Sequence, residues 1–277
     1  MENKDYFRSP DQLLQELAIT VPDEIDIEAI AFHCNATVRY RSLTGCAARI
    51  VGNGDYAIIT VDSGSPRPRQ RFSAAHELGH WMYDRGKASL SCQDTQFLKE
   101  WSASNPEARA NRYASSLLLP VKLFSPIAKT FSTADFTVIK NLAETFVTSL
   151  TATAIRLVEW GPFPAMLICH SGEGREWFVR APGVRDELWP SSRPEKDTLA
   201  SRLLNSATER ELIGEVPARA WFDHPSAGKH YIQEHSLRPR IGWVLSLLWW
   251  KDERMLIELE ECEETKASRR SDRREEE

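Results

Sequence analysis

The chain has 277 residues, of which 42% are hydrophobic and 27% are charged, and its formal net charge is −5. This composition is that of a globular protein, and the length allows two domains. The acidic balance disfavours a nucleic-acid binder, because such proteins usually carry a basic stripe.

The N-terminal part of the sequence predicts two short helices followed by a small sheet. Apolar residues at helical spacing indicate helices at residues 10–20 and 25–34, with Asp23 as the N-cap of the second helix. The period then changes to two, and glycine-containing turns separate three strand-like segments: residues 37–41, 47–51 and 56–61.

Helical patterns dominate the next part of the chain. One helix is expected at residues 70–83, and a second begins with the Asn-Pro-Glu sequence at residues 105–107 and stops at Pro120. Two further helical segments, at residues 134–146 and 150–159, are separated by a short turn. Together they form a helix-turn-helix pattern.

The remainder of the chain mixes strands with one helix, and it follows a Gly/Pro-rich boundary at residues 161–164. The helix is expected at residues 196–204. Four segments are strand-like: residues 166–169, 177–180, 243–250 and 255–259. Residues 251–254 are expected to join the last two strands as a hairpin. The charged segment 264–277 is expected to be disordered.

The cysteines and the N-terminal segment favour a cytoplasmic protein. The five cysteines are scattered and form no C-x-x-C pair, which argues against a disulfide framework and against a thiolate zinc site. Residues 1–12 lack the apolar core of a signal peptide, and the apolar run at 243–250 is too short to cross a bilayer. A soluble protein in a reducing compartment, without membrane contact, is therefore expected.

The segment that carries the clearest chemistry is His76-Glu77-Leu78-Gly79-His80. Residues four apart on a helix lie on one face, so both imidazoles can bind one ion. Zinc suits imidazole ligands in a tetrahedral site, and another divalent ion such as Mn²⁺ is the alternative. Glu77, at the edge of the same face, is placed to hold a water without binding the metal. Two helix histidines bonded elsewhere are the alternative interpretation.

Glu107 is the candidate for the third protein ligand, which a catalytic zinc needs in addition to an open position. Small residues at positions 110 and 114 let its helix lie close to the helix of the histidines. Asn111, one turn after Glu107, is a candidate outer hydrogen-bond partner for a ligating side chain. The alternative role of Glu107 is a first-turn charge that complements the helix dipole.

Two sequence blocks carry a family resemblance. Residues 71–80 are RFSAAHELGH, and residues 107–120 are EARANRYASSLLLP. They match the patterns R-F-(S/T)-x-A-H-E-x-G-H and E-x-x-A-N-x-(F/Y)-A-x-x-L-L-x-P of the ImmA/IrrE family of metallo-endopeptidases. The chain resembles this family over about residues 20 to 160.

The resemblance implies that His76, His80 and Glu107 bind the metal and that Glu77 is the catalytic glutamate. The chain departs from the family pattern at two positions. Asp84 stands where many members have a histidine four residues after the second ligand. Arg109 replaces an acidic residue that is common in the second block. Neither departure changes the expected ligands, and both concern the surroundings of the site.

The resemblance also implies a biological role, namely zinc-dependent cleavage of a bacterial helix-turn-helix transcriptional repressor in stress response or mobile-element control. The substrate peptide is expected to lie extended beside a sheet edge. Residues 56–61 are the candidate edge strand, with an interior strand as the alternative. Tyr83 and Tyr113 are candidate donors to the oxyanion, although packing is the favoured role of each.

Three other interpretations stay open. The chain could be a catalytically idle metal-binding regulatory module that acts through protein–protein contacts. DNA binding by residues 150–159 is disfavoured, because this helix carries one Arg and one Glu, whereas a recognition helix offers several polar and basic side chains. His224, His230 and His235 could form a second metal site, with a solvated loop as the favoured interpretation.

The expected fold is α+β with three domains and a tail. A zincin-like metallopeptidase domain is expected at residues 1–122, and a helix-turn-helix extension at 123–162. A mixed α/β C-terminal domain, a candidate sensor, follows at residues 163–263, and the disordered tail is expected at 264–277.

Overall fold

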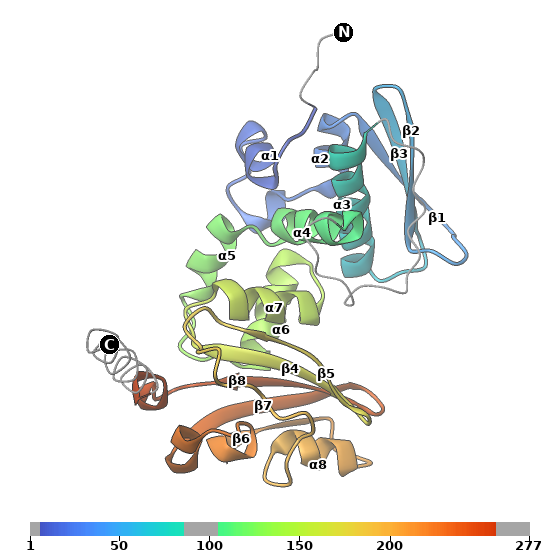
Figure 1. Ribbon diagram of the computed structural model, residues 1–277. Helices are drawn as coiled ribbons and strands as arrows, with labels where there is room; N and C mark the ends of the chain where they lie inside the picture. The colour runs from blue at the N-terminus through green and yellow to red at the C-terminus, as the bar shows by residue number, and fades with distance from the viewer. Residues whose placement is uncertain (1–5, 86–104, 259–277) are drawn as a thin grey trace, which may run out of the picture. The chain divides into compact units, whose positions relative to one another are not determined.

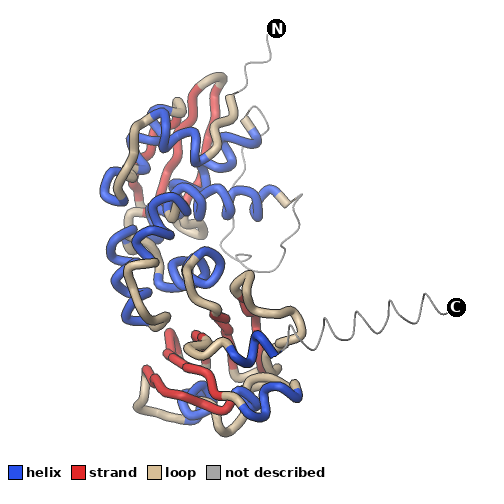
Figure 2. The backbone as a smooth tube through the Cα atoms, turned by 90° about the vertical axis from the view of Figure 1, so that its left-hand side faces the viewer, coloured by secondary structure: helices blue, strands red, loops and turns tan. Residues whose placement is uncertain are grey.

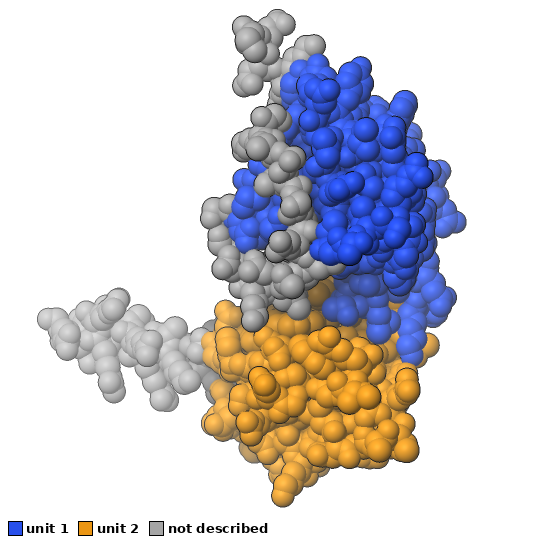
Figure 3. Space-filling view, turned by 90° about the vertical axis from the view of Figure 1, so that its right-hand side faces the viewer, with its two compact units in different colours: residues 1–127, 140–153 blue, residues 128–139, 154–277 orange. Residues whose placement is uncertain are grey.

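The computed structural model describes residues 6–85 and 105–258, which belong to two compact units (Figure 3). The first unit comprises Met1–Ile127 and Lys140–Thr153, and the second comprises Ala128–Ile139 and Ala154–Glu277. Each unit is therefore assembled from two stretches of chain. Both contain helices and a sheet, as the α+β prediction requires.

Several predictions concern residues that the structure does not describe, namely Cys92, Cys262 and the charged tail at 264–277. The three-domain division with boundaries at residues 122 and 162 stays a prediction. Within the described ranges, no helix combines the length and the hydropathy that crossing a bilayer requires.

The sheet of the first unit has three strands: β1 (Ala36–Arg41), β2 (Ala48–Asn53) and β3 (Tyr56–Asp62) (Figure 1). Its order is β1-β3-β2, with β1 parallel and β2 antiparallel to β3. Ile59 pairs with Val38 on one side and with Ile50 on the other. The prediction that residues 56–61 form an edge strand is therefore wrong, and β1 and β2 are the edges.

Helices cover one face of this sheet. Alternate residues of β3 are buried, among them Ile59 and Val61 at 0% exposure, because they face α3 (Arg67–Asp84), while α2 (Ile27–His33) packs against β1 (Figures 1 and 2). The N-cap of α2 is Asp26, whose carboxylate accepts hydrogen bonds from the first turn. The predicted cap, Asp23, instead lies in the preceding 3-10 turn.

The other helices of the N-terminal half lie close to their predicted places, with one addition. They are α1 (Pro10–Glu16), α4 (Pro106–Leu118), α5 (Val121–Ala128), α6 (Phe136–Phe146) and α7 (Leu150–Trp160). The sequence did not indicate α5, because Pro120 precedes it and Pro126 lies inside it. The assignment of α6 and α7 to a helix-turn-helix module stays a prediction.

The sheet of the second unit has five antiparallel strands in the order β5-β4-β8-β7-β6 (Figure 1). Its elements are β4 (Ala165–Ser171), β5 (Gly174–Arg180), α8 (Leu199–Asn205), β6 (Glu211–Pro217), β7 (Tyr231–Arg240) and β8 (Trp243–Trp249). The predicted hairpin after β8 is wrong, because residues 254–258 are helical. The Asp252 side chain accepts a hydrogen bond from the Arg254 amide at the start of this turn, as an N-cap does.

A buried carboxylate ties α8 to this sheet. Glu234 of β7 is 0% exposed and accepts hydrogen bonds from the amides of Leu199 and Ala200, at 3.0 and 2.7 Å. It also accepts from Trp221 Nε1 and from Ser236 Oγ. Burial raises the pKa of Glu234, although the four hydrogen-bond donors act in the opposite direction. The carboxylate is therefore a fully bonded structural group.

Candidate metal centre

The two histidines of the H-E-x-x-H segment lie one turn apart on α3 and face the same point. Their rings are 4.8 Å apart between centroids and nearly perpendicular, and their Nε2 atoms are 3.1 Å apart. His76 is 6% exposed and His80 is 2% exposed. The helix therefore gives both imidazoles the shared orientation that their spacing predicts.

Glu107, in the first turn of α4, completes the cluster. Its amide donates to the side chain of Asn105, which caps the helix. Its Oε2 atom lies 3.2 Å from His76 Nε2, and its Oε1 atom lies 3.3 Å from His80 Nε2. These contacts hold the pKa of the Glu107 carboxyl well below its usual range. Although burial opposes protonation, Glu107 and then Glu77 raise the pKa of His80.

The cluster fits a divalent metal by its spacing and its chemistry. Its three ligand atoms lie within 4.8 Å of one another. Ligands at about 2.0–2.1 Å from a tetrahedral zinc would lie roughly 3.3 Å apart. The two Nε2 atoms are 3.1 Å apart, and each lies 3.2 or 3.3 Å from one of the two Glu107 oxygens, which is close to this value. Among the described residues no fourth His, Cys, Asp or Glu joins the group, which is the open arrangement of catalytic zinc sites.

Each imidazole also faces a polar side chain on the side away from the cluster. His76 Nδ1 lies 2.9 Å from Asn111 Oδ1, so Asn111 contacts a candidate ligand. His80 Nδ1 lies 3.6 Å from Asp84 Oδ2. From the sequence, Asp84 stood out only as a departure from the family pattern. Its spacing of four residues from His80 was the available signal for this contact.

Glu77 is 1% exposed and lies beside His76 in α3. Its charge contributes to the raised pKa of His80, so its carboxylate is within electrostatic range of the cluster. The two tyrosines considered as oxyanion donors have other contacts. The Tyr113 hydroxyl donates to the Arg8 carbonyl at 2.9 Å, and Tyr83 packs edge-on against Tyr113. Both tyrosines thus have packing contacts.

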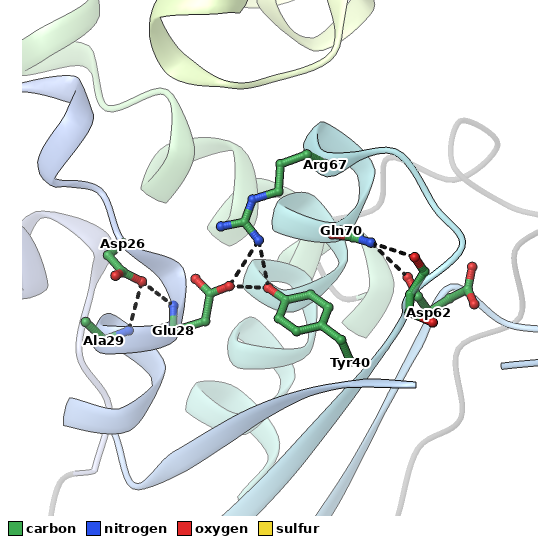
Figure 4. Close-up of polar contacts among 8 residues, drawn as sticks. Asp26, Glu28, Ala29, Tyr40, Asp62, Arg67 and Gln70 are labelled. Carbon is green, nitrogen blue, oxygen red and sulfur yellow. Dashed lines mark hydrogen bonds and ion pairs between the residues drawn. The ribbon is translucent and has the colours of Figure 1, made fainter. Parts of the chain in front are cut away.

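Polar contacts fix the first turn of α3 against its neighbours (Figure 4). Arg67 Nη1 donates to Glu28 Oε1 of α2 and to the Tyr40 hydroxyl of β1, both at 3.2 Å. The Tyr40 hydroxyl in turn donates to Glu28. Gln70 Nε2 donates to the Ser63 carbonyl at 3.2 Å. These contacts anchor the helix that carries both histidines to the sheet and to α2.

The three histidines considered for a second metal site have separate partners. His224 accepts from the Ser226 amide, His230 Nε2 lies 3.0 Å from Glu258, and His235 Nε2 lies 2.8 Å from Glu211. His235 is 4% exposed, so it is not part of a solvated loop. Within residues 6–85 and 105–258, the His76, His80 and Glu107 group is the one cluster that could hold a metal ion.

The close approach of α3 and α4 at Gly79 sets the distance between the histidines and Glu107. A Cβ atom on Gly79 would lie 3.1 Å from Ala110 Cα and 3.1 Å from Tyr113 Cβ. Because Ala110 Cα is a backbone atom, the two helices would have to separate. Glycine has a lower helix propensity than alanine, and the close packing of the two helices explains why glycine stands at this position.

We expect the steric conflict in Gly79→Ala to lower the free energy of unfolding by about 1–3 kcal/mol. The higher helix propensity of alanine offsets ~1 kcal/mol of this loss. Zinc affinity should fall in parallel, because Glu107 moves with α4. Urea unfolding and a zinc titration measure the two effects. Gly172→Ala is the control, since no atom lies within 4 Å of its Cβ position. An unchanged zinc affinity in Gly79→Ala would contradict this account.

Comparisons with known proteins bear on the fold and the family. The model of the peptidase M78 family, described as an IrrE N-terminal-like domain, matches residues 33–158. None of the curated proteins matches the sequence. The chain is similar in fold to a transcriptional regulator from Mycobacterium tuberculosis, with a TM-score of 0.58 and 12% identity over 89% of this chain and 76% of that one.

That likeness concerns the fold alone, whereas the family match includes the two sequence blocks around His76 and Glu107. The match confirms the resemblance predicted from those blocks: residues 33–158 of this chain form an IrrE N-terminal-like domain of the peptidase M78 family.

Proposed function

We propose that the chain is a zinc-dependent endopeptidase in which His76, His80 and Glu107 hold the metal and Glu77 is the general base. The observation that carries the proposal is the convergence of the two Nε2 atoms of α3, 3.1 Å apart, on the Glu107 carboxylate of α4, whose two oxygens lie 3.2 and 3.3 Å from them. Two imidazoles and one glutamate are a ligand set of hydrolytic zinc sites. Mn²⁺ is the alternative ion.

Each residue has a role that follows from its position. Zinc in such a site supplies Lewis-acid polarisation of the scissile carbonyl and lowers the pKa of water. Glu77 takes the proton of the attacking water and returns it to the leaving amine. Because Glu77 is 1% exposed, little bulk water screens its interaction with the reacting groups. Asn111 holds the His76 ring through Nδ1, which leaves Nε2 directed at the metal position.

The substrate that we propose is a helix-turn-helix transcriptional repressor, cleaved in the cytoplasm during stress response or mobile-element control. The family resemblance supports this choice, and the structural neighbour from M. tuberculosis is itself named a transcriptional regulator. An extended peptide would add to β1 or β2, which are the edges of the sheet beside α3.

The experiment that tests the proposal combines metal analysis with a cleavage assay on the repressor encoded nearest to this chain. We expect about one zinc per chain, a single main cleavage of the repressor, and loss of cleavage when a chelator removes the metal. Adding Zn²⁺ or Mn²⁺ back should restore cleavage. Purified protein that takes up neither ion would exclude a metallopeptidase.

DNA binding through α7 has little structural support. Arg156, the arginine of this helix, is 7% exposed, and Ala154, Leu157 and Val158 are buried. A recognition helix needs exposed polar side chains on one face. These residues are instead typical of a packed helix.

A further inference from the structure

A buried carboxylate lies behind one of the proposed zinc ligands. His80 Nε2 faces Glu107 at 3.3 Å, and the opposite ring nitrogen, Nδ1, faces Asp84 Oδ2 at 3.6 Å. The side chains of His80 and Asp84 are 2% and 8% exposed. A carboxylate on the outer nitrogen of a metal-binding histidine fixes its tautomer and its ring orientation. Asp84 thus faces the same ring nitrogen of His80 that Asn111 contacts in His76, although its distance of 3.6 Å is longer than the 2.9 Å hydrogen bond of Asn111.

Arg109 of α4 holds the other oxygen of this carboxylate. Its Nη2 atom donates to Asp84 Oδ1 at 3.2 Å, so the two oxygens of Asp84 are divided between the arginine and the histidine. The guanidinium also lies 5.1 Å from the ring centre of Tyr83, which restricts its position. Arg109 follows Glu107 by two residues in the same helix, so one rigid element carries a proposed ligand and this contact.

The position of Asp84 at the end of α3 is unfavourable for an aspartate, so a role in folding alone does not explain this residue well. Asp84 is the last residue of α3, where the negative end of the helix dipole disfavours an anion. It is also buried, which disfavours its charge further. Arg109 offsets both effects. The two positions at which the chain departs from the family pattern thus contact each other at 3.2 Å, and the arginine supplies the positive charge beside the carboxylate.

We propose that Asp84 and Arg109 act as a pair that positions His80 for metal binding, with Arg109 acting through Asp84. This inference rests on the proposed zinc site. An ion pair that merely links α3 to α4 would affect folding without affecting the metal. The two roles are separated by measuring zinc affinity and thermal stability on the same variants.

The experiment uses the full chain and measures zinc affinity by competition with a chromophoric chelator. We expect Asp84→Ala to weaken zinc binding by about 10- to 100-fold, the range for lost outer partners of a ligand. Arg109→Ala should weaken it by a smaller factor. The double variant should bind zinc no more weakly than Asp84→Ala alone, because Arg109 has no effect once Asp84 is absent. Arg109→Lys, which keeps the charge, should retain most of the affinity.

Two further variants control for misfolding and for the loss of any arginine from α4. Asp84→Asn keeps the side-chain volume and should fold, while its lost charge should still weaken zinc binding. Arg112→Ala removes an exposed arginine from the same helix and should leave zinc affinity unchanged. In the Co²⁺-substituted protein, the visible absorption spectrum should change in Asp84→Asn and stay unchanged in Arg112→Ala, because it reports the geometry around the metal.

The outcomes distinguish this inference from the proposed function. If the unmodified protein binds no zinc, the proposed function fails, and the pairing fails with it. If it binds zinc, and Asp84→Asn and Arg109→Ala lower the melting temperature without changing zinc affinity, the pair is only a link between helices. If the effects of Asp84→Ala and Arg109→Ala add in the double variant, Arg109 does not act through Asp84.

Discussion

Replacing Glu77 with glutamine is expected to abolish most peptide cleavage while leaving zinc binding intact. Glutamine has nearly the same volume, so the packing around this 1% exposed side chain should survive. It cannot accept the proton of the attacking water. Loss of a general base lowers rates by about 10²- to 10⁴-fold, which corresponds to roughly 3–5 kcal/mol of transition-state stabilisation.

The measurement is kcat/KM on the repressor, together with zinc content for the same preparation. Glu144→Gln is a matched control, because Glu144 is an exposed glutamate in α6. We expect that variant to cleave at the unmodified rate. Cleavage by Glu77→Gln within a few-fold of normal would exclude Glu77 as the base. If repressor control in cells persists without cleavage, the chain acts as a catalytically idle metal-binding regulator.

The local part of the candidate site was accessible from the sequence, because helix geometry alone determines it. His76 and His80 are four residues apart in a segment with strong helical signals, so their shared face follows from 3.6 residues per turn. Glu107 lies on a different helix, and no local rule brings it to the histidines. The usable signals were the Asn105 cap, the small residue Ala110, and the family pattern.

Strand order was harder to predict than strand position. The alternation of Ala57, Ile59 and Val61 shows that β3 has one buried face, and this pattern is the same for an edge strand and a central one. Pairing depends on contacts that are distant in sequence. β3 lies between β1 and β2 because β1 pairs with it in parallel. The short turns in the sequence suggested antiparallel neighbours and did not reveal this pairing.

In the second unit, buried polar residues concealed a whole strand. Glu234, His235 and Ser236 are at most 4% exposed within β7, although a run of polar residues usually indicates a surface segment. Glu234 is buried because the start of α8 and Trp221 supply its hydrogen bonds. Such partners cannot be identified from composition or periodicity, because they come from elements far apart in the chain.

Removing the Glu107 carboxylate is expected to have the largest effect on the metal itself. Glu107→Ala leaves two imidazoles, and we expect zinc affinity to fall by more than about 100-fold, beyond the range for outer partners. At a zinc concentration 100 times the dissociation constant, bound metal adds about 2.7 kcal/mol to the stability of the unmodified protein. A 100-fold weaker site would add only about 0.4 kcal/mol at that concentration. Thermal unfolding with and without zinc measures this difference.

The pH dependence of the same variant separates metal binding from a simple ion pair. In the folded protein the pKa of Glu107 is lowered and the pKa of His80 is raised. Without metal, the pair of these two charged groups therefore stabilises the fold at pH values above the unfolded pKa of the carboxyl and below the folded pKa of the imidazole. This contribution is lost as the imidazole deprotonates. Zinc binding requires neutral imidazoles, so its contribution grows over the same rise in pH. Glu107→Ala should therefore destabilise the metal-free protein mainly in mild acid. It should destabilise the zinc-loaded protein mainly at higher pH, where the imidazoles are neutral. A loss of stability that is independent of both zinc and pH would instead assign Glu107 to the capping of α4, and Glu144→Ala controls for the loss of a helix glutamate.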